Sequence, residues 1–384
     1  MFKTIKILFS QPMSRTVGLT FLLHSFLFGS LATRLPDIKH QLNLSASDMG
    51  WALLGMSVGG LCVMPFMSWL MSRLGTGRSN IIFCTLMSFI ILIPITATSF
   101  WMLIIGFYLY GATMGAQDVA MNAAADAVEK KYGVKIMSTC HGMFSIGAMF
   151  GAIIASYIAG QSISKETHML FVVFAMLLLL AYLSRHLMRL PKIITAEDAL
   201  FVLPKGNLLI MGAVGFCIMM GEGAVNDWSA IYFKDSLMTN SYMTGFGLAA
   251  FSLTMAIGRF YGDAIVPKYG AKRIVGFGSL LGGIGVLIVV VSPSIIGAII
   301  GFAVVGIGFS CVVPVLFRNA ANVPNVASGT GVAAVTSAGI CGFLIGPPTI
   351  GFIGEAYGLN YGLGIVAVLG VLAFLFSLRV TWYD

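Results

Sequence analysis

The amino-acid sequence predicts an all-α membrane protein with about twelve transmembrane helices in two pseudo-symmetric six-helix bundles. Three observations lead to this fold class. Charged residues are scarce, the apolar residues fall into blocks of membrane-spanning length, and the second half repeats the glycine pattern of the first.

Composition argues against a water-soluble fold. Charged residues make up 9% of the 384-residue chain and hydrophobic residues make up 58%. Soluble domains carry about 25% charged residues, so this chain has too few to cover the surface of a soluble fold of its size. The remaining apolar surface must face lipid.

Apolar blocks of about 20 residues are long enough to cross a hydrocarbon core of about 30 Å. A polar stretch from Pro191 to Lys205 separates six such blocks from six. We therefore predict an N-terminal bundle at residues 1–190, a cytoplasmic linker at 191–205 and a C-terminal bundle at 206–384. The predicted spans are residues 15–34, 47–71, 79–97, 100–128, 137–160, 167–189, 206–233, 241–265, 274–291, 294–318, 327–352 and 359–381.

The basic residues orient these spans. With both termini in the cytoplasm, sixteen of the 22 Lys and Arg residues fall in cytoplasmic segments. The opposite side holds four, namely Arg34, Lys39, Lys165 and Lys234. This positive-inside bias orients the multi-pass protein, which we expect in the inner (plasma) membrane with both termini cytoplasmic. It also accounts for the formal charge of +8 without a nucleic-acid partner.

The glycines indicate an internal repeat. A shift of 195 residues superimposes six glycine pairs, where chance overlap would give roughly two or three. The same shift pairs Arg73 with Lys268 and Arg78 with Arg273. A constant offset over five spans indicates a duplicated six-helix unit, an architecture found in transporters. The pairs are Gly50 with Gly245, Gly75 with Gly270, Gly106 with Gly301, Gly111 with Gly306, Gly147 with Gly342, and Gly151 with Gly346.

Five stretches carry a family resemblance: ATRLPDIKHQL at 32–42, DVAMNAAADAVE at 118–129, HGMFSIGAMFGA at 141–152, EGAVNDWSAIY at 222–232 and GRFYGDAIVPKYGAKR at 258–273. The chain resembles the major facilitator superfamily throughout its length, and within it the bacterial YbjJ-type inner-membrane proteins. The resemblance implies twelve helices in two bundles, transport by alternating access, and a central cavity lined mainly by helices 1, 4, 7 and 10.

The loop between the second and third helices departs from the superfamily pattern. The family usually carries an aspartate before the arginine of this loop, whereas this chain reads SRLGTGR, with Ser72 at the acidic position. The matching loop of the second half keeps Asp263 after Gly262, followed by Lys268, Lys272 and Arg273. We therefore expect a charge latch in the second half, formed by Asp263, Lys268 and Arg273. Arg259 lies four residues before Asp263, a spacing that predicts an ion pair on one helix.

Ionisable side chains inside a span are functional candidates, because they are costly in hydrocarbon. In the fourth span the spacing places Asp118, Asn122 and Asp126 on one helical face, with Glu129 one turn further. Asp118 is the deepest and is a candidate proton carrier. The structural alternative is a hydrogen bond to His141 or Ser145 on the fifth span. Asp126 and Glu129 are expected to be helix-end charges.

The seventh span carries the first choice for proton coupling, Glu222. Asn226 and Ser229 follow on the same face, so Asn226 is a candidate for the substrate cavity. Asp227 and Trp228 are further cavity candidates, with an interfacial position as the alternative for Trp228. Gly221 and Gly223 flank Glu222, which predicts a loosely packed and bendable backbone there.

Two histidines and one arginine complete the candidates for the cavity. His24, near the middle of the first span, and His141, at the start of the fifth, titrate near neutrality when unperturbed. Arg318 in the tenth span either pairs with a carboxylate of the protein, such as Glu222, or binds an anionic group of a solute.

The function that fits these features is secondary active transport of a small polar solute, with protons as the coupling ion and symport as the mode. The alternative within transport is a proton-driven exporter of drugs or other amphiphiles, whose cavity should be mostly aromatic. The alternative of another class is a membrane sensor or scaffold that transports nothing. An enzyme is not expected, because the sequence has no HExxH motif, no GxSxG with a partner histidine and no phosphate-binding GxxxxGK(S/T) motif. We expect no cofactor and no metal, with the solute, protons and the bilayer as partners of a monomer.

Overall fold

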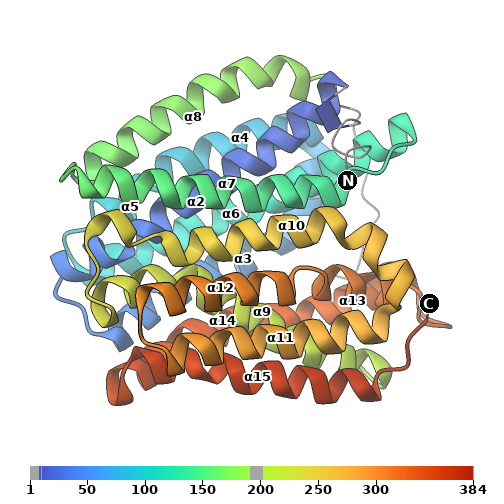
Figure 1. The fold of residues 1–384 in the computed structure, drawn as a ribbon. Helices are drawn as coiled ribbons and strands as arrows, with labels where there is room; N and C mark the ends of the chain where they lie inside the picture. Colours follow the sequence, from blue (N-terminus) through green and yellow to red (C-terminus); the bar gives the residue numbers. More distant parts are fainter. Residues whose placement is uncertain (1–7, 10, 191–201, 384) are drawn as a thin grey trace. The chain divides into compact units, whose positions relative to one another are not determined.

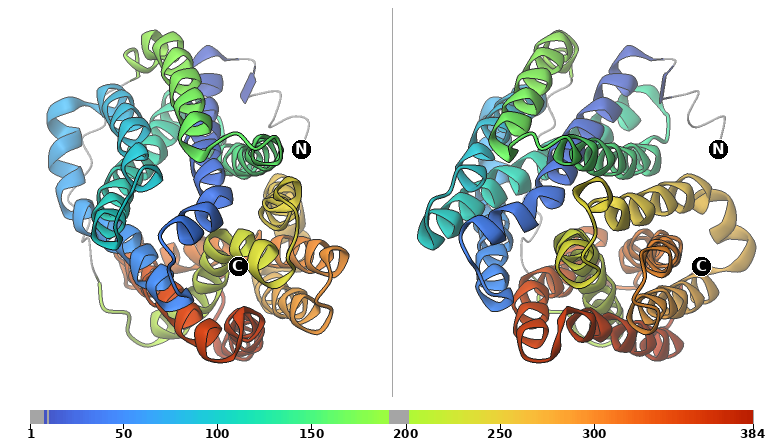
Figure 2. Two further views of the ribbon diagram at one scale, coloured as in Figure 1. Left: turned by 90° about the vertical axis from the view of Figure 1, so that its left-hand side faces the viewer. Right: turned by 60° about the vertical axis from the view of Figure 1, so that its left-hand side comes forward.

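A computed structural model describes residues 8, 9, 11–190 and 202–383. Regular structure in these residues is helical throughout (Figures 1 and 2). The α-helices are α2 (Pro12–Gln41), α3 (Ala46–Leu74), α4 (Thr76–Ile90), α5 (Leu92–Ile95), α6 (Phe100–Tyr132), α7 (Met137–Gly160), α8 (Lys165–Leu187), α9 (Asn207–Ile231), α10 (Phe246–Tyr269), α11 (Ala271–Val291), α12 (Ile295–Phe309), α13 (Val312–Ala321), α14 (Ser328–Tyr357) and α15 (Leu359–Arg379). A π-helical turn, η1 (Tyr232–Ser236), and a 3₁₀ turn, η2 (Ser241–Met243), follow α9.

These helices make up the twelve predicted spans. Within the described residues, eleven helical stretches are long and apolar enough to cross a membrane, and the remaining span is α6. With 33 residues, α6 is long enough to cross the membrane. Its mean hydropathy is lowered by Gln117, Asp118, Asn122 and Asp126. A bilayer enforces helices because backbone polar groups in hydrocarbon must be paired within the segment. This explains why blocks of apolar residues predict the spans well.

The first span is longer than predicted. The sequence suggested an end near Arg34, where charge begins, but α2 continues through Pro36 and Asp37 to Gln41. Arg34 and Pro36 are buried, so this stretch packs inside the protein instead of emerging as a loop. The helix can continue past Arg34 because the buried guanidinium has polar partners inside the protein.

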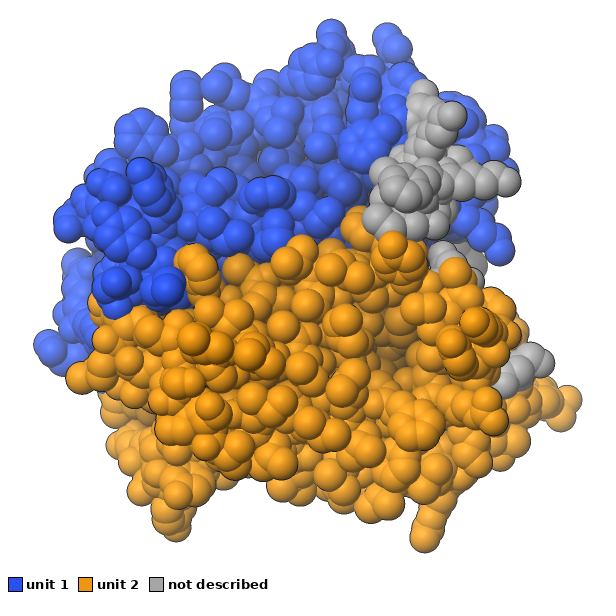
Figure 3. Space-filling model, in the orientation of Figure 1, with its two compact units in different colours: residues 1–44, 52–197, 240–245 blue, residues 45–51, 198–239, 246–384 orange. Residues whose placement is uncertain are grey.

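The helices gather into two compact units, shown in different colours in Figure 3. Unit 1 comprises Met1–Leu44, Ala52–Glu197 and Asn240–Gly245, and unit 2 comprises Ser45–Trp51, Asp198–Thr239 and Phe246–Asp384. Each unit therefore contains a short segment from the other half of the chain. The predicted linker lies mostly outside the described residues, and the boundaries at 190 and 206 stay predictions.

The two units repeat the same helix pairings. In unit 1, α2 packs along α7 and α4 packs along α6; in unit 2, α9 packs along α14 and α11 along α12. These are the first with the fifth and the third with the fourth span of each half. Contacts of α4 with α8 and of α11 with α15 extend the correspondence to the sixth span.

The glycine pairs of the sequence repeat occupy matching contacts. A Cβ at Gly111 would overlap the carbonyl of Met56, and one at Gly306 would overlap the carbonyl of Phe251, 195 residues further on. Gly147 abuts the carbonyl of Leu22 in the same way that Gly342 abuts that of Phe216. Small residues allow membrane helices to approach this closely, so the repeat in sequence reflects a repeat in packing.

The turns after the second span of each half also match. Gly75 and Gly270 have φ angles of 80° and 77°, a region that side chains other than glycine rarely enter. Each glycine lets the chain reverse directly from one long helix into the next, which keeps the loop to a single residue.

Ser45–Trp51, which belongs to unit 2, and Asn240–Gly245, which belongs to unit 1, are called the exchanged segments. Their contacts match as well. Within unit 2, the backbone of Gly50 lies against the carbonyl of Pro347, and within unit 1 that of Gly245 lies against the carbonyl of Ala152. Both residue numbers again differ by 195. The amide of Gly245 donates to Ser156 Oγ at 2.7 Å, and the amide of Ser47 donates to Glu355 Oε2 at 2.9 Å.

Candidate functional site

Glu222 and Arg259 form an ion pair in unit 2. Glu222 lies on α9 and Arg259 on α10, with 3.9 Å between Oε2 and Nη2. The side chains are 13% and 16% exposed, so both are largely buried and each keeps a small accessible surface. Because charge is costly in a low-dielectric region, each group stabilises the ionised form of the other.

The glycines around Glu222 do not loosen the helix. α9 is continuous from Asn207 to Ile231, and both glycines lie against aromatic rings. A Cβ at Gly221 would lie 2.7 Å from Phe309, and one at Gly223 would lie 2.8 Å from Phe343. The expectation of loose packing is therefore wrong: the glycines admit neighbouring side chains and fix the position of Glu222.

The sequence predicts that Arg259 pairs with Asp263. It also predicts that Arg318 is a candidate partner of Glu222. The side chain of Asp263 lies outside the described part of the structure. Arg318 is exposed on α13, and the salt bridge of Glu222 is formed with Arg259. This partnership was missed because Glu222 and Arg259 lie on different helices, where sequence spacing carries no signal.

Asp118 lies on α6 in unit 1 and is partly accessible. Asn122 Nδ2 donates to Asp118 Oδ1 at 3.3 Å and to the Asp118 carbonyl at 2.9 Å. The partner is therefore on the same helix face, as the spacing of four residues predicted, and the pair presents an amide and a carboxyl together.

The carboxylates further along α6 have structural partners. Asp126 pairs with the exposed Lys130 at 2.8 Å, and Glu129 Oε1 accepts the backbone N–H of Met137 at 2.8 Å. The second contact joins the end of α6 to the start of α7. Both residues act as helix-end charges.

Four polar residues follow Glu222 on α9. Asn226 is partly accessible, as is Glu222 one turn earlier, whereas Asp227, Trp228 and Ser229 are buried. Trp228 is completely buried within unit 2, so its ring faces neither the lipid interface nor an open cavity in this structure. The Trp228 indole N–H and the Ser229 hydroxyl have no hydrogen-bond partner among the described residues.

The two histidines contact the same pair of helices. The ring of Phe21 on α2 lies 5.3 Å from that of His141 on α7, and the His24 ring lies 5.5 Å from that of Phe144. His24 is 1% exposed, and its Nδ1 has no partner in the described part of the chain. His141 is partly accessible.

The basic residues predicted to form a latch lie at the end of α10. Lys268 stacks over the ring of Tyr269 at 5.3 Å, and Arg273 is exposed on the first turn of α11. Neither forms a salt bridge within the described residues. The latch with Asp263 stays a prediction.

Comparison with known proteins assigns the family. The model of the Major Facilitator Superfamily matches residues 17–204 and 211–384. The chain belongs to the Major Facilitator Superfamily. It is therefore a multi-pass membrane transporter.

Curated relatives agree with this assignment. An uncharacterised MFS-type transporter of Yersinia pestis is 33% identical over 342 residues, covering 88% of each chain. Membrane protein MosC of Rhizobium meliloti is 29% identical, covering 93% of this chain and 87% of that protein. The solved nucleoside transporter NupG has a similar fold, with a TM-score of 0.70 at 15% identity over 97% of this chain and 100% of that one.

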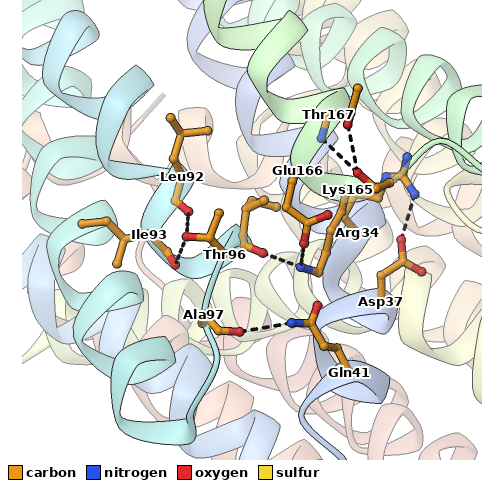
Figure 4. A network of polar contacts seen from close by, with 12 residues as sticks. Arg34, Asp37, Gln41, Leu92, Ile93, Thr96, Ala97, Lys165, Glu166 and Thr167 are labelled. Atoms are coloured by element: carbon orange, nitrogen blue, oxygen red, sulfur yellow. Dashed lines mark hydrogen bonds and ion pairs between the residues drawn. The ribbon is translucent and has the colours of Figure 1, made fainter.

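This superfamily member also has a charged network in unit 1 that the sequence did not reveal (Figure 4). Arg34 on α2 is 4% exposed and pairs with Asp37 at 2.8 Å. Its Nε donates to His168 Nδ1 at 3.3 Å and its Nη2 donates to the Ile163 carbonyl at 3.0 Å. The guanidinium therefore joins α2 to α8 and the turn before it.

Lys165 extends the same network. It is 5% exposed, donates to the carbonyl of Ile95 and pairs with Glu166. Gln41 at the end of α2 donates to the Ala97 carbonyl at 3.4 Å. The sequence predicts Arg34 and Lys165 on the side opposite the cytoplasm, and in the structure both are buried. The spacing of Arg34 and Asp37 was the available sign of an intrahelical pair.

A second missed feature joins α4 to α6 through amides. Asn80 Nδ2 donates to the Ala120 carbonyl at 2.8 Å, and Gln117 Nε2 donates to Asn80 Oδ1 at 3.2 Å. Both side chains are fully buried. Such hydrogen bonds join membrane helices, so this link fixes the rotation of α6 and with it the direction of Asp118.

Proposed function

We propose that this protein is a secondary active transporter that moves a small polar solute across the inner membrane, coupled to protons through Glu222. The observation that carries the proposal is the ion pair between Glu222 and Arg259. Symport, in which solute and proton move in the same direction, is the mode we favour.

The pair can respond to protonation. A carboxylate beside a guanidinium stays ionised more readily than an isolated one, and a proton on Glu222 removes that attraction. The separation of 3.9 Å is longer than the 2.8 Å of the Arg34–Asp37 pair. A proton or a solute group that reaches the accessible surface of Glu222 would therefore compete with a weak contact. A ligand shifts a conformational equilibrium by its different affinities for the two states, so this competition can drive transport.

Asp118 is the second candidate for the coupling site. It is partly accessible, and its hydrogen bond from Asn122 leaves one carboxylate oxygen for a proton or a solute. With Asn226 close to Glu222 along α9, each unit offers a carboxyl and an amide on one helix face. His24, His141, Asp227, Trp228 and Arg318 stay secondary candidates for solute contact.

This pairing of carboxyl and amide favours a polar solute over the alternative, an exporter of amphiphiles. Amides and carboxylates recognise hydroxyl and amino groups through directed hydrogen bonds, whereas a drug-binding cavity relies on apolar and aromatic surface. Trp228, the aromatic candidate on α9, is fully buried and therefore presents no exposed ring surface to an amphiphile in this structure.

Alternating access would use the exchanged segments. In unit 2 the start of α3 contacts α14 through Ser47–Glu355 and through the rings of Trp51 and Phe352, 5.7 Å apart. In unit 1, η2 contacts α7 through Gly245–Ser156 and Tyr242–Gln161. We propose that each of these contacts belongs to a gate and breaks when that gate opens. In the proposed topology both termini are cytoplasmic, which places these contacts on the side of the membrane opposite the cytoplasm. Reporter fusions placed in residues 191–205 test that orientation.

The proposal is tested by finding the solute and then its coupling. Thermal-shift screening of the purified protein against polar metabolites and amphiphilic drugs identifies the class, because a ligand that binds the folded state raises the melting temperature. Uptake into proteoliposomes with an imposed pH gradient then measures coupling. If only amphiphiles raise the melting temperature, the proposal of a polar solute is wrong. If uptake does not depend on the pH gradient, the proposal of proton coupling is wrong.

A further inference from the structure

The last described residues of the chain fold back across one end of unit 2. α15 ends at Arg379, and Val380 is extended and 6% exposed. The next residues meet two asparagine side chains from other helices. Trp382 donates its indole N–H to the Ser377 carbonyl at 3.2 Å, which turns the segment towards α15. Residues 380–383 are called the strap below.

Asn207, the first residue of α9, binds the strap through its backbone. Its Nδ2 donates to the Thr381 carbonyl at 2.8 Å, and its Oδ1 accepts the Thr381 amide at 2.9 Å. The side-chain amide thus pairs with both backbone groups of one residue, as a neighbouring β-strand would. Asn207 follows directly on Gly206, where the linker region enters α9.

Asn319 on α13 binds the strap two residues further along. Its Oδ1 accepts the amide of Tyr383 at 2.9 Å, while its Nδ2 donates to the Val315 carbonyl at 3.1 Å. Asn319 is 3% exposed. The strap therefore joins the start of α9, the end of α15 and the short helix α13.

α13 is separated from α12 by a break at Ser310 and Cys311. Pro314 explains the break, because proline has no N–H to offer the carbonyl of Ser310 and clashes with it. The corresponding span of unit 1 is the continuous helix α6, in which the position matching Pro314 is Val119. The break is thus absent from unit 1, so the helix arrangement that the two units have in common does not require a break at this position.

The strap also lacks a counterpart in unit 1. Moving back by the repeat of 195 residues places Pro12 at the position of Asn207 and Ala124 at that of Asn319. Neither side chain can form these hydrogen bonds. Break and strap thus occur together in the same half, and Asn319 on α13 joins them directly through its hydrogen bond from Tyr383.

We propose that α13 is a movable segment hinged at Ser310–Cys311, and that the strap holds it against the start of α9. The two asparagines bind the backbone of residues 381 and 383, so release of the strap from α9 and α13 breaks three hydrogen bonds to side-chain amides. The strap thereby controls the position of α13 and of Arg318, which lies on α13. This inference does not depend on the solute or on the coupling ion.

The test measures accessibility in the full-length protein with its six cysteines replaced. Val380→Cys reports on the strap, and Leu316→Cys, at a fully buried position on α13, reports on the hinge. Labelling by a water-soluble maleimide should be slow at both sites. Asn207→Ala should speed labelling of Val380→Cys about fivefold or more, the scale expected for losing exposed hydrogen bonds. Deletion of residues 380–384 should speed labelling of Leu316→Cys similarly.

Matched variants separate these effects from general damage. Asn322→Ala at the end of α13 should label as slowly as the parent protein, since the side chain of Asn322 forms no hydrogen bond with the described residues of the strap. Asn207→Asp keeps the acceptor for Thr381 but loses the donor, so it should be intermediate. Melting temperature and size-exclusion profile check that each variant is folded. If Val380→Cys is unaffected by Asn207→Ala, or if Leu316→Cys stays protected in the folded deletion variant, the proposed control of α13 by the strap is wrong.

Discussion

Arg259 on α10 lies 3.9 Å from Glu222 on α9, and both side chains are largely buried with a small accessible surface. Two opposite charges in this position stabilise each other, and removal of either leaves the other uncompensated. The contact is also long enough for a proton or a solute group to compete for it. This relationship motivates the first two predictions.

Glu222→Gln should abolish accumulation of solute against its gradient while leaving exchange largely intact. Glutamine imitates the neutral, protonated acid, so the site can no longer change its proton occupancy. The measurement is uptake into proteoliposomes under an imposed pH gradient. Asp126→Asn is the matched control, because Asp126 forms an exposed helix-end pair with Lys130. If Glu222→Gln still accumulates solute and Asp118→Asn does not, the coupling site belongs on α6.

Arg259→Gln should destabilise the protein more than the double variant Glu222→Gln/Arg259→Gln does. A buried carboxylate that loses its cation costs about 3–5 kcal/mol, and making it neutral recovers part of that cost. Thermal unfolding of the four proteins of this double-mutant cycle measures the coupling. The same cycle with Arg318→Gln should be additive, because Arg318 is exposed on α13. Strong coupling with Arg318 and none with Arg259 would identify the other arginine as the partner.

Arg34→Gln should lower the melting temperature by roughly 5 °C or more. The variant leaves Asp37, His168 and the Ile163 carbonyl without their shared donor in a buried region. The exposed Arg78→Gln serves as control and should have little effect. Similar melting temperatures for the two variants would show that the network contributes little to stability.

Gly245→Val should keep the proposed gate from closing. The added Cβ would lie 2.6 Å from the Ala152 carbonyl and 2.7 Å from Ser156 Oγ. A cysteine at the fully buried Ala152 should then react faster with a water-soluble maleimide. Gly364→Ala, where the nearest atom is 3.6 Å away, should leave the rate unchanged. Equal rates in both variants argue against a gate at this contact.

Asp263→Asn should change the accessibility of cavity cysteines, whereas Ser72→Ala should not. The reason is the asymmetry of the two loops, since the second half keeps the acid and the basic residues Lys268 and Arg273 that the latch requires. Maleimide labelling of matched cysteine probes in both halves is the measurement. Effects of equal size would remove the argument for a latch confined to the second half.

Local sequence determined the spans and the repeat. A bilayer leaves a segment only its own backbone for hydrogen bonding, so apolar length alone predicts helices such as α11 and α15. The glycine pairs followed from sequence for a related reason. Gly111 and Gly306 permit the same close approach of two backbones, so the duplicated packing had to retain small residues at both positions.

Only the tertiary structure decided which polar groups meet. Hydropathy does not state how a helix is rotated about its axis, and rotation decides whether Glu222 faces Arg259 or Arg318. The contacts of Arg34 with residues of α8, and of Asn207 and Asn319 with the end of the chain, likewise join segments far apart in sequence. Sequence periodicity therefore identified candidate side chains such as Glu222 and Asp118, whereas packing between helices assigned their partners and showed that Arg34, Lys165 and Trp228 are buried.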